Sequence, residues 1–116
     1  MSKALSTCVN GDVTIVELLG TSLSGLSDLD PLRQELDELI SNKQPSCLLI
    51  NFKNVKFINS DAIGILIARR KALVAQGGEM KMCEMNPTIR LSFKALNLDG
   101  TLFEILDSEE EGISAF

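Results

Sequence analysis

Histidine, tryptophan and tyrosine are absent from the 116 residues of this chain. Without histidine, the protein lacks the usual general base near neutral pH and the commonest zinc ligand. Its three cysteines, Cys8, Cys47 and Cys83, are too far apart for a zinc knuckle and odd in number for a set of disulfides. We therefore expect no metal, no cofactor and no enzymatic activity, and we expect the cysteines to be small buried side chains in a reducing compartment.

Long hydrophobic runs are also missing. No apolar stretch approaches the about 20 residues that a membrane-spanning helix needs, and the N-terminus lacks the apolar core of a signal peptide. We therefore expect a cytoplasmic protein without direct membrane insertion. The formal net charge of −5 argues against nucleic-acid binding, because nonspecific affinity comes mainly from neutralising phosphates. The dense basic cluster Arg69-Arg70-Lys71 indicates a solvated helix face or, alternatively, a contact with a partner or a lipid headgroup.

The composition, 45% hydrophobic and 23% charged, is that of one globular domain spanning residues 1–116. Residues 5–19 predict two strands joined by a type I′ turn at Asn10-Gly11. The apolar run 47–52 is typical of a central strand that is covered on both faces. Alternating patterns predict further strands over residues 80–85 and 102–105.

Four helices are expected, because apolar residues recur at helical spacing after residues that cap helices well. Residues 22–29 read as a loop before the first of them. The expected helices begin at Pro31 after a cap at Asp30, run from about Asp61 to Gln76 with a stop at Gly77-Gly78, begin at Asn86-Pro87, and follow a cap at Asp107-Ser108. We predict an α/β fold in which an opening β-hairpin precedes alternating strands and helices, with a mixed sheet of about five strands and about four helices.

The polar triplet Asn59-Ser60-Asp61 stands where a buried-strand pattern gives way to a helix. A helix start has unpaired N–H groups and about half a positive charge, so it favours carboxylate or phosphate. Plain helix capping would also select these residue types. The place of the triplet, beyond the carboxyl end of a predicted parallel strand, favours binding. The predicted partner-binding surface consists of Lys56, Asn59, Ser60, Asp61, Ala62 and Gly64.

Gly64 is unusual within this predicted helix, since glycine there costs about 1 kcal/mol relative to alanine. A tolerated cost of this size suggests a close approach by a neighbouring backbone or by a partner.

Three consecutive segments form a recognisable pattern: the strand Leu48-Leu49-Ile50-Asn51-Phe52, the spacer Val55–Ile58 and the helix opening Asn59-Ser60-Asp61-Ala62-Ile63-Gly64. They resemble the STAS family, the domain shared by sulfate transporters and bacterial anti-sigma-factor antagonists. The family signature is a short apolar strand with Asp near its end, a spacer ending in an apolar pair, and Asp-Ser-Ser-Gly opening a helix. The order of elements is similar over nearly the whole chain, down to the acidic helix at Glu109-Glu110-Glu111. The resemblance implies a single STAS-like domain.

In the antagonists, the second hydroxyl residue of Asp-Ser-Ser-Gly is phosphorylated by a partner kinase, which is itself the anti-sigma factor. Matched by position, that phosphoacceptor is Asp61, while Ser60 matches the unmodified serine, and Asn59 and Ala62 replace the acidic residue and the glycine. A carboxylate supplies one negative charge and two acceptor oxygens, whereas phosphoserine supplies about −1.5 to −2 and three. Asp61 is therefore a partial mimic of the phosphorylated state. The alternative is that Ser60 has taken over as the site of phosphorylation.

The resemblance implies a non-enzymatic interaction module that regulates transcription in a partner-switching pathway. Its implied partners are an anti-sigma factor that is also a serine kinase and a serine phosphatase that resets the switch. The alternative is the small structural STAS subunit of a lipid-transport ABC system, which braces an ATPase and needs no phosphorylation. A phosphate-binding loop of the Walker type is disfavoured, because Gly77-Gly78 follows a helix instead of opening one. Self-association is left open by the sequence.

Overall fold

The opening hairpin pairs β1 (Leu5–Asn10) with β2 (Val13–Leu18) in the computed structural model, which describes residues 4–116. The hairpin prediction is confirmed, but the predicted turn is one residue too early, because Gly11 and Asp12 form it. Of these two residues only Gly11 has a positive φ, 62°. This is the φ pattern of a type II′ turn, which places glycine at the first central position, and not of the predicted type I′ turn.

The main sheet has five strands in the order β1-β2-β4-β6-β7. Beyond the hairpin these are β4 (Cys47–Asn51), β6 (Glu79–Cys83) and β7 (Ile105–Leu106). Neighbouring pairs from β2 to β7 are parallel and only β1 runs antiparallel, so the predicted mixed sheet is confirmed. The last strand begins later than expected, because the N–H of Phe103 bonds the carbonyl of Leu98 and holds the preceding residues in a turn.

A second, small sheet joins β3 (Ser22–Leu23) to β5 (Phe57–Ile58) in parallel. The prediction of a loop over residues 22–29 is wrong at both ends, because Ser22 and Leu23 form a strand and a helix already begins at Leu26. Sequence patterns do not reveal this pairing, since each strand has two residues and the partners lie far apart in the chain. The pairing brings the segment before the first helix against the segment before the second.

The four predicted helices are confirmed. They are α1 (Leu26–Lys43), α2 (Ser60–Ala75), α3 (Pro87–Ala95) and α4 (Glu109–Ser114). The predicted caps of the last two are found at Asn86 and Ser108, whose side chains accept from Ile89 N and Glu111 N. Gly77 follows α2 with a φ of 87°, as a left-handed C-terminal position requires.

The predicted start of the first helix is wrong. The helix begins at Leu26 after Gly25, and Pro31 lies inside it instead of opening it. Both Asp28 N and Leu29 N donate to the carbonyl of Gly25, which closes the first turn. Burial of Leu29, 3% exposed, supports this extra turn and outweighs the hydrogen bond that a proline inside a helix forfeits.

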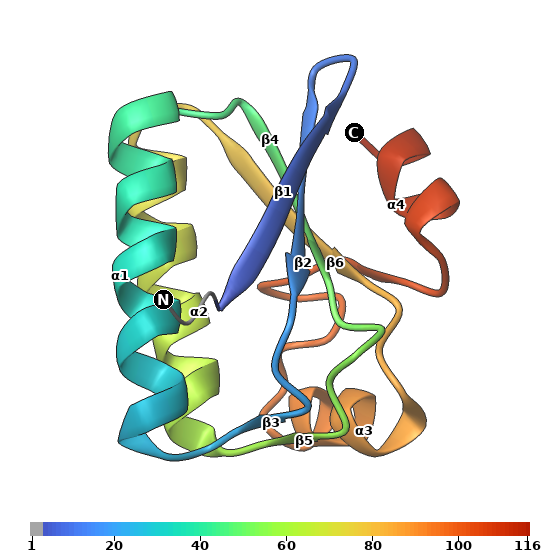
Figure 1. Cartoon of the computed structure of the whole chain (residues 1–116). Helices are drawn as coiled ribbons and strands as arrows, with labels where there is room; N and C mark the ends of the chain where they lie inside the picture. The colour runs from blue at the N-terminus through green and yellow to red at the C-terminus, as the bar shows by residue number, and fades with distance from the viewer. Residues whose placement is uncertain (1–3) are drawn as a thin grey trace.

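Two apolar cores lie on opposite faces of the sheet. Figure 1 shows α1 and α2 side by side on one face and α4 on the other. The larger core lies beneath α1, α2 and α3 and includes Val16, Leu48 and Ile50. The smaller core consists of Val13, Ile15, Leu49 and Cys83, and Ile113 and Phe116 from the α4 region pack against it. Burial on both faces explains the continuous apolar run of β4.

The cysteines differ in exposure. Cys83 is buried and Cys47 is half-buried, but Cys8 is exposed, so the prediction of three buried cysteines is wrong for Cys8. The reason is topological, because β1 forms an outer edge of the sheet. Burial, together with the charges of Glu84 and Glu109, raises the pKa of the Cys83 thiol to about 12, which keeps it protonated near neutral pH.

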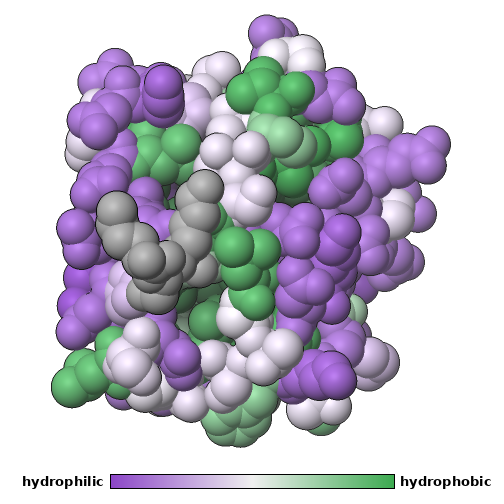
Figure 2. All heavy atoms as spheres, viewed as in Figure 1, coloured by the Kyte–Doolittle hydropathy of each residue, from purple (hydrophilic) through white to green (hydrophobic). Residues whose placement is uncertain are grey.

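The surface of the molecule is mixed. Figure 2 shows hydrophilic side chains over the α1 side at the left and a neutral to hydrophobic band along the course of β1. Within residues 4–116, no helix is at once long enough and apolar enough to cross a membrane.

Candidate functional site

Asn59 organises the start of α2. It is the N-cap residue, and its side-chain oxygen accepts a hydrogen bond from Ala62 N at 2.9 Å. Its side-chain nitrogen donates to the carbonyl of Ser24 at 2.8 Å, and its backbone N–H donates to the carbonyl of Leu23 at 3.1 Å. Asn59 therefore caps α2 and also fastens it to the segment that leads into α1, so that the two helices start beside each other (Figure 1).

Ser60 and Asp61 occupy the first turn of α2, and both are exposed. Among residues 4–116, neither side chain makes a hydrogen bond or an ion pair. The cap that sequence reasoning weighed for the whole triplet is supplied by the side chain of Asn59. Ser60 and Asp61 thus present a hydroxyl and a carboxylate to solvent at a helix N-terminus, where a negative charge is favourable by about 0.3–1 kcal/mol.

The remaining residues of the predicted surface divide by burial. Lys56 and Gly64 are exposed, as a contact surface requires. Ala62 is 0% exposed and packs in the larger core, so its side chain is unavailable to a partner and the prediction that included it is wrong. Ala62 is the third residue after the cap Asn59, and together with the neighbouring buried Ile63 it lies on the face of the helix that turns toward the core.

Two exposed hydrophobic side chains extend this surface and were missed by sequence reasoning. Phe57 is 55% exposed, next to the buried Ile58, because adjacent residues of a strand face opposite ways. Leu26 is 74% exposed at the start of α1, two residues after the Ser24 carbonyl that Asn59 holds. We use the name switch surface for the set of exposed residues Leu26, Lys56, Phe57, Ser60, Asp61 and Gly64.

Gly64 tests the idea of a close approach. A Cβ built there meets nothing within 4 Å, so the neighbouring backbone that the sequence suggested is not present in the described part of the chain. Replacing Gly64 by alanine is expected to raise the free energy of unfolding by about 0.5–1 kcal/mol, since alanine favours helix and no atom is displaced. Urea unfolding measures the change. Ala68→Gly, at an exposed position of the same helix, is the matched control and should lower stability by a similar amount; a destabilising Gly64→Ala would contradict the argument.

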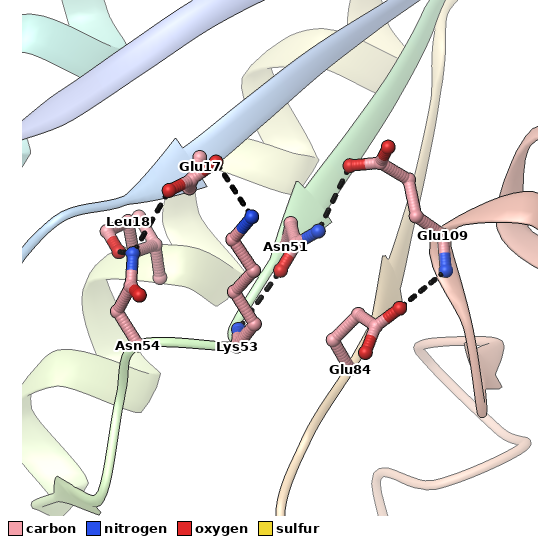
Figure 3. Close-up of polar contacts among 7 residues, drawn as sticks. All are labelled: Glu17, Leu18, Asn51, Lys53, Asn54, Glu84 and Glu109. Carbon is pink, nitrogen blue, oxygen red and sulfur yellow. Dashed lines mark hydrogen bonds and ion pairs between the residues drawn. The ribbon is translucent and has the colours of Figure 1, made fainter.

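A polar cluster at the carboxyl ends of the strands supports the loop that leads to the site (Figure 3). Asn51, at the end of β4, is 2% exposed, and both polar atoms of its side chain are hydrogen-bonded. Its side-chain nitrogen donates to Glu109 Oε1 at 2.9 Å, and its oxygen accepts from Lys53 N at 2.8 Å. Glu84 Oε2 accepts from Glu109 N at 2.8 Å. These bonds hold the first residue of α4 against the ends of β4 and β6.

The other half of the cluster is centred on Glu17, at the end of β2 (Figure 3). Asn54 donates to Glu17 Oε1 at 2.9 Å, and Lys53 Nζ lies 3.5 Å from Glu17 Oε2. The cluster thus fixes the β4–β5 loop on both sides. Its members satisfy one another, and within residues 4–116 no three Cys, Asp or Glu side chains gather in a way that could hold a metal ion. The cluster therefore has a positioning role.

The basic cluster 69–71 is divided in the structure. Arg69, with a side chain 17% exposed, makes a two-pronged contact with Asp37 on α1 at 2.8 and 3.1 Å. This hydrogen bond lowers the pKa of the Asp37 carboxyl. Lys71 is exposed and Arg70 is half-buried. The expectation of one solvated face is therefore wrong for Arg69, which links the two long helices.

Comparison with known proteins adds independent information. The family model described as the STAS domain matches residues 5–112. The chain is 31% identical over 103 residues to a protein of Paenibacillus polymyxa named anti-sigma F factor antagonist, covering 89% of this chain and 83% of that protein.

Solved structures share the fold. An anti-sigma factor antagonist from Mycobacterium paratuberculosis is similar with a TM-score of 0.82 at 20% identity, over 96% of this chain and 91% of that chain. The Bacillus cell fate determinant SpoIIAA in its phosphorylated form is similar with a TM-score of 0.71 at 23% identity, over 97% of this chain and 98% of that one.

The order of elements, the capped start of α2 and the sequence matches agree with one another. The structural neighbours support the arrangement of strands and helices, and the family model accounts for nearly every described residue. The chain therefore belongs to the STAS domain family.

Proposed function

We propose that this protein is a non-enzymatic, cytoplasmic regulator of the anti-sigma-factor-antagonist type, and that its switch surface binds an anti-sigma factor. The observation that carries the proposal is the exposed pair Ser60 and Asp61, whose side chains make no hydrogen bond within residues 4–116, at a helix start already capped by Asn59. Leu26, exposed at the start of α1, and Phe57, exposed on β5 just before α2, supply the apolar area that a protein contact needs. The relative from Paenibacillus polymyxa named as an antagonist lends support from sequence.

The proposed partner is a serine kinase as well as an anti-sigma factor, and a serine phosphatase resets the switch. A related structure represents a phosphorylated form, so phosphate addition occurs on at least one protein of this fold. In this chain a carboxylate stands at the position that matches the usual acceptor. We infer that Asp61 supplies part of the negative charge of a phosphoserine permanently. The protein is then held close to the phosphorylated state, or it has a partner adapted to that charge.

Replacing Asp61 by serine is expected to tighten binding to an anti-sigma kinase about tenfold, or about 1.4 kcal/mol, because it removes a fixed charge from the contact. The partner is first captured from the native cells with wild-type protein and Asp61→Ser as baits, and is then titrated by calorimetry. Mass spectrometry of both proteins after incubation with that kinase and ATP shows whether the new serine, or Ser60 in the wild type, accepts phosphate.

Glu110→Ser is the matched control. Glu110 is also an exposed carboxylate in the first turn of a helix, but on α4. The substitution Glu110→Ser removes one negative charge, as Asp61→Ser does, but leaves the switch surface intact. Its affinity for the anti-sigma kinase should therefore equal that of the wild type. Equal affinities of wild type and Asp61→Ser, without phosphorylation of either, would refute the assignment of Asp61 as a phosphoserine mimic.

The alternative, a structural subunit that braces the ATPase of a lipid-transport system, has support from a different surface. Val74 is 45% exposed, and it lines a hollow of about 480 Å³ together with Arg70 and Leu102. An exposed apolar side chain and a cation on one patch suit a stable subunit contact. Capture of a transporter ATPase by both baits would favour this alternative, since such a contact does not involve Asp61.

A further inference from the structure

The two edges of the five-stranded sheet are built differently. β7, at one edge, has two residues and is flanked by Glu104 and Asp107. Short edge strands and charged flanking residues are the usual means of preventing pairing with another chain. β1, at the other edge, has six residues, Leu-Ser-Thr-Cys-Val-Asn, without a charge, a proline or a bulge. Within residues 4–116, only the β7 edge of the sheet is therefore protected in these ways.

The backbone groups that β1 offers at this edge follow from its register. Leu19 N donates to Ala4 O at 2.9 Å, which makes these opposite residues a hydrogen-bonded pair. In an antiparallel ladder such pairs alternate with non-hydrogen-bonded ones. The N–H and C=O groups of Ser6, Cys8 and Asn10 consequently point toward β2. Those of Leu5, Thr7 and Val9 point outward, and no strand or helix of residues 4–116 runs along this edge (Figure 1).

We propose that the free edge of β1 pairs with β1 of a second copy of this chain, antiparallel about a two-fold axis at Cys8. In that register Thr7 and Val9 of one copy lie opposite Val9 and Thr7 of the other. Thr7 and Val9, two of the three outward-pointing residues, then find ladder partners, and two β-branched side chains meet across the strands. Val9 is 72% exposed in the single chain and becomes covered.

Charge favours a second copy at this edge. Each copy has a formal net charge of −5, so most approaches place like charges together. Residues 4–10 contain no charged residue, and Figure 2 shows the band along β1 as neutral to hydrophobic. β1 itself thus brings no charged side chain into the contact between two acidic copies, and the carboxylate of Glu35, which accepts from Ala4 N at 2.7 Å, lies four residues from the axis at Cys8. The pairing leaves Ser60 and Asp61 of both copies free, so it is independent of the proposed partner contact.

The expected dimer is weak. One pair of six-residue strands buries much less than the about 1,200 Å² of a standard stable interface. Dimers should accordingly form at high protein concentration and dissociate on dilution. This predicts a concentration-dependent sedimentation coefficient for the wild-type protein, and a monomer at every concentration for Val9→Lys, which places a charge in the middle of the edge at an exposed position.

Cys8 reports on the register. Because its own backbone groups face β2, the two Cys8 residues form a non-hydrogen-bonded pair across the axis, with Cα atoms about 4.5 Å apart. Disulfides span Cα distances of about 4.4–6.8 Å. With copper phenanthroline as oxidant, the two thiols lose two electrons to Cu(II) and two protons to the buffer and form one disulfide. Cys83 is buried with its pKa near 12, so it does not compete.

The decisive experiment combines sedimentation with crosslinking at matched concentrations. Wild type should dimerise reversibly and crosslink, Cys8→Ser should dimerise without crosslinking, and Val9→Lys should lose at least nine-tenths of the crosslinked product. The register is tested by Ser6→Cys and Asn10→Cys, each in the Cys8→Ser background. Position 6 of one copy faces position 10 of the other in the proposed dimer. A mixture of the two variants should therefore crosslink, whereas neither variant should crosslink by itself. A wild type that stays monomeric, or crosslinking that is equal in Val9→Lys, overturns the proposal.

Discussion

Replacing Phe93 by alanine is expected to lower the free energy of unfolding by about 3–5 kcal/mol, the usual cost of removing a buried aromatic ring. Phe93 is 0% exposed, and its ring packs edge-on against Phe52 at 6.2 Å and Phe103 at 5.9 Å between centroids. Such aromatic contacts add about 0.5–1.5 kcal/mol each to burial alone. Phe93 and Ile89 are the buried residues of α3, so the helix keeps only one anchor after the change.

Urea unfolding followed by circular dichroism measures this loss. Leu91→Ala, on the same helix, removes a hydrophobic side chain that is 65% exposed and should change stability by less than about 0.5 kcal/mol. Equal losses in the two variants would show that α3 contributes little to the core.

Replacing Asn51 by aspartate is expected to lower the free energy of unfolding by about 1–3 kcal/mol at pH 7, the cost of leaving a buried polar group without its partner. The side-chain nitrogen of Asn51 donates to Glu109 at 2.9 Å, and a carboxylate there loses that bond and faces a like charge. The substitution restores the residue of the general family signature, so a gain in stability would be the intuitive expectation. The contact with Glu109 predicts the opposite.

The stability that Asn51→Asp loses relative to wild type should become smaller as the pH falls. Two facing carboxylates hold a shared proton more tightly in the folded variant than in the unfolded chain, so the folded state binds more protons. By linkage, the stability of the variant then rises relative to wild type as pH is lowered toward about 4. Urea unfolding at pH 7 and pH 4.5 tests the sign. Adding Glu109→Gln to the variant removes the repulsion and should recover stability at pH 7, and a variant whose deficit is the same at both pH values would contradict this account.

The site illustrates how far local sequence carries an inference. Asn59, Ser60 and Asp61 are placed correctly at the start of α2, because capping preferences depend on a few neighbouring residues. The choice of Asn59 as the cap also depends on a contact with a distant part of the chain. Its amide also donates to Ser24, 35 residues away, and a carboxylate lacks the N–H that this bond needs.

Burial is the property that sequence reasoning predicted least well. Ala62 was expected at the surface and lies in the core, whereas Cys8 was expected in the core and lies on an exposed edge. Each error has the same cause. The sequence does not show which elements cover a given face of the sheet. A shift of one residue along a helix, or of one place in the strand order, is enough to change a side chain from buried to exposed.

Composition and short-range patterns were enough to establish the acidic charge, the absence of histidine, the order of the four helices and of the main-sheet strands, and the family. The fold was needed to show which side chains of the switch surface are exposed, that Asn51 holds Glu109, and that β1 lies at an edge of the sheet. These features arise from contacts between residues distant in the chain, such as the pairing of β3 with β5, and no local pattern encodes such contacts.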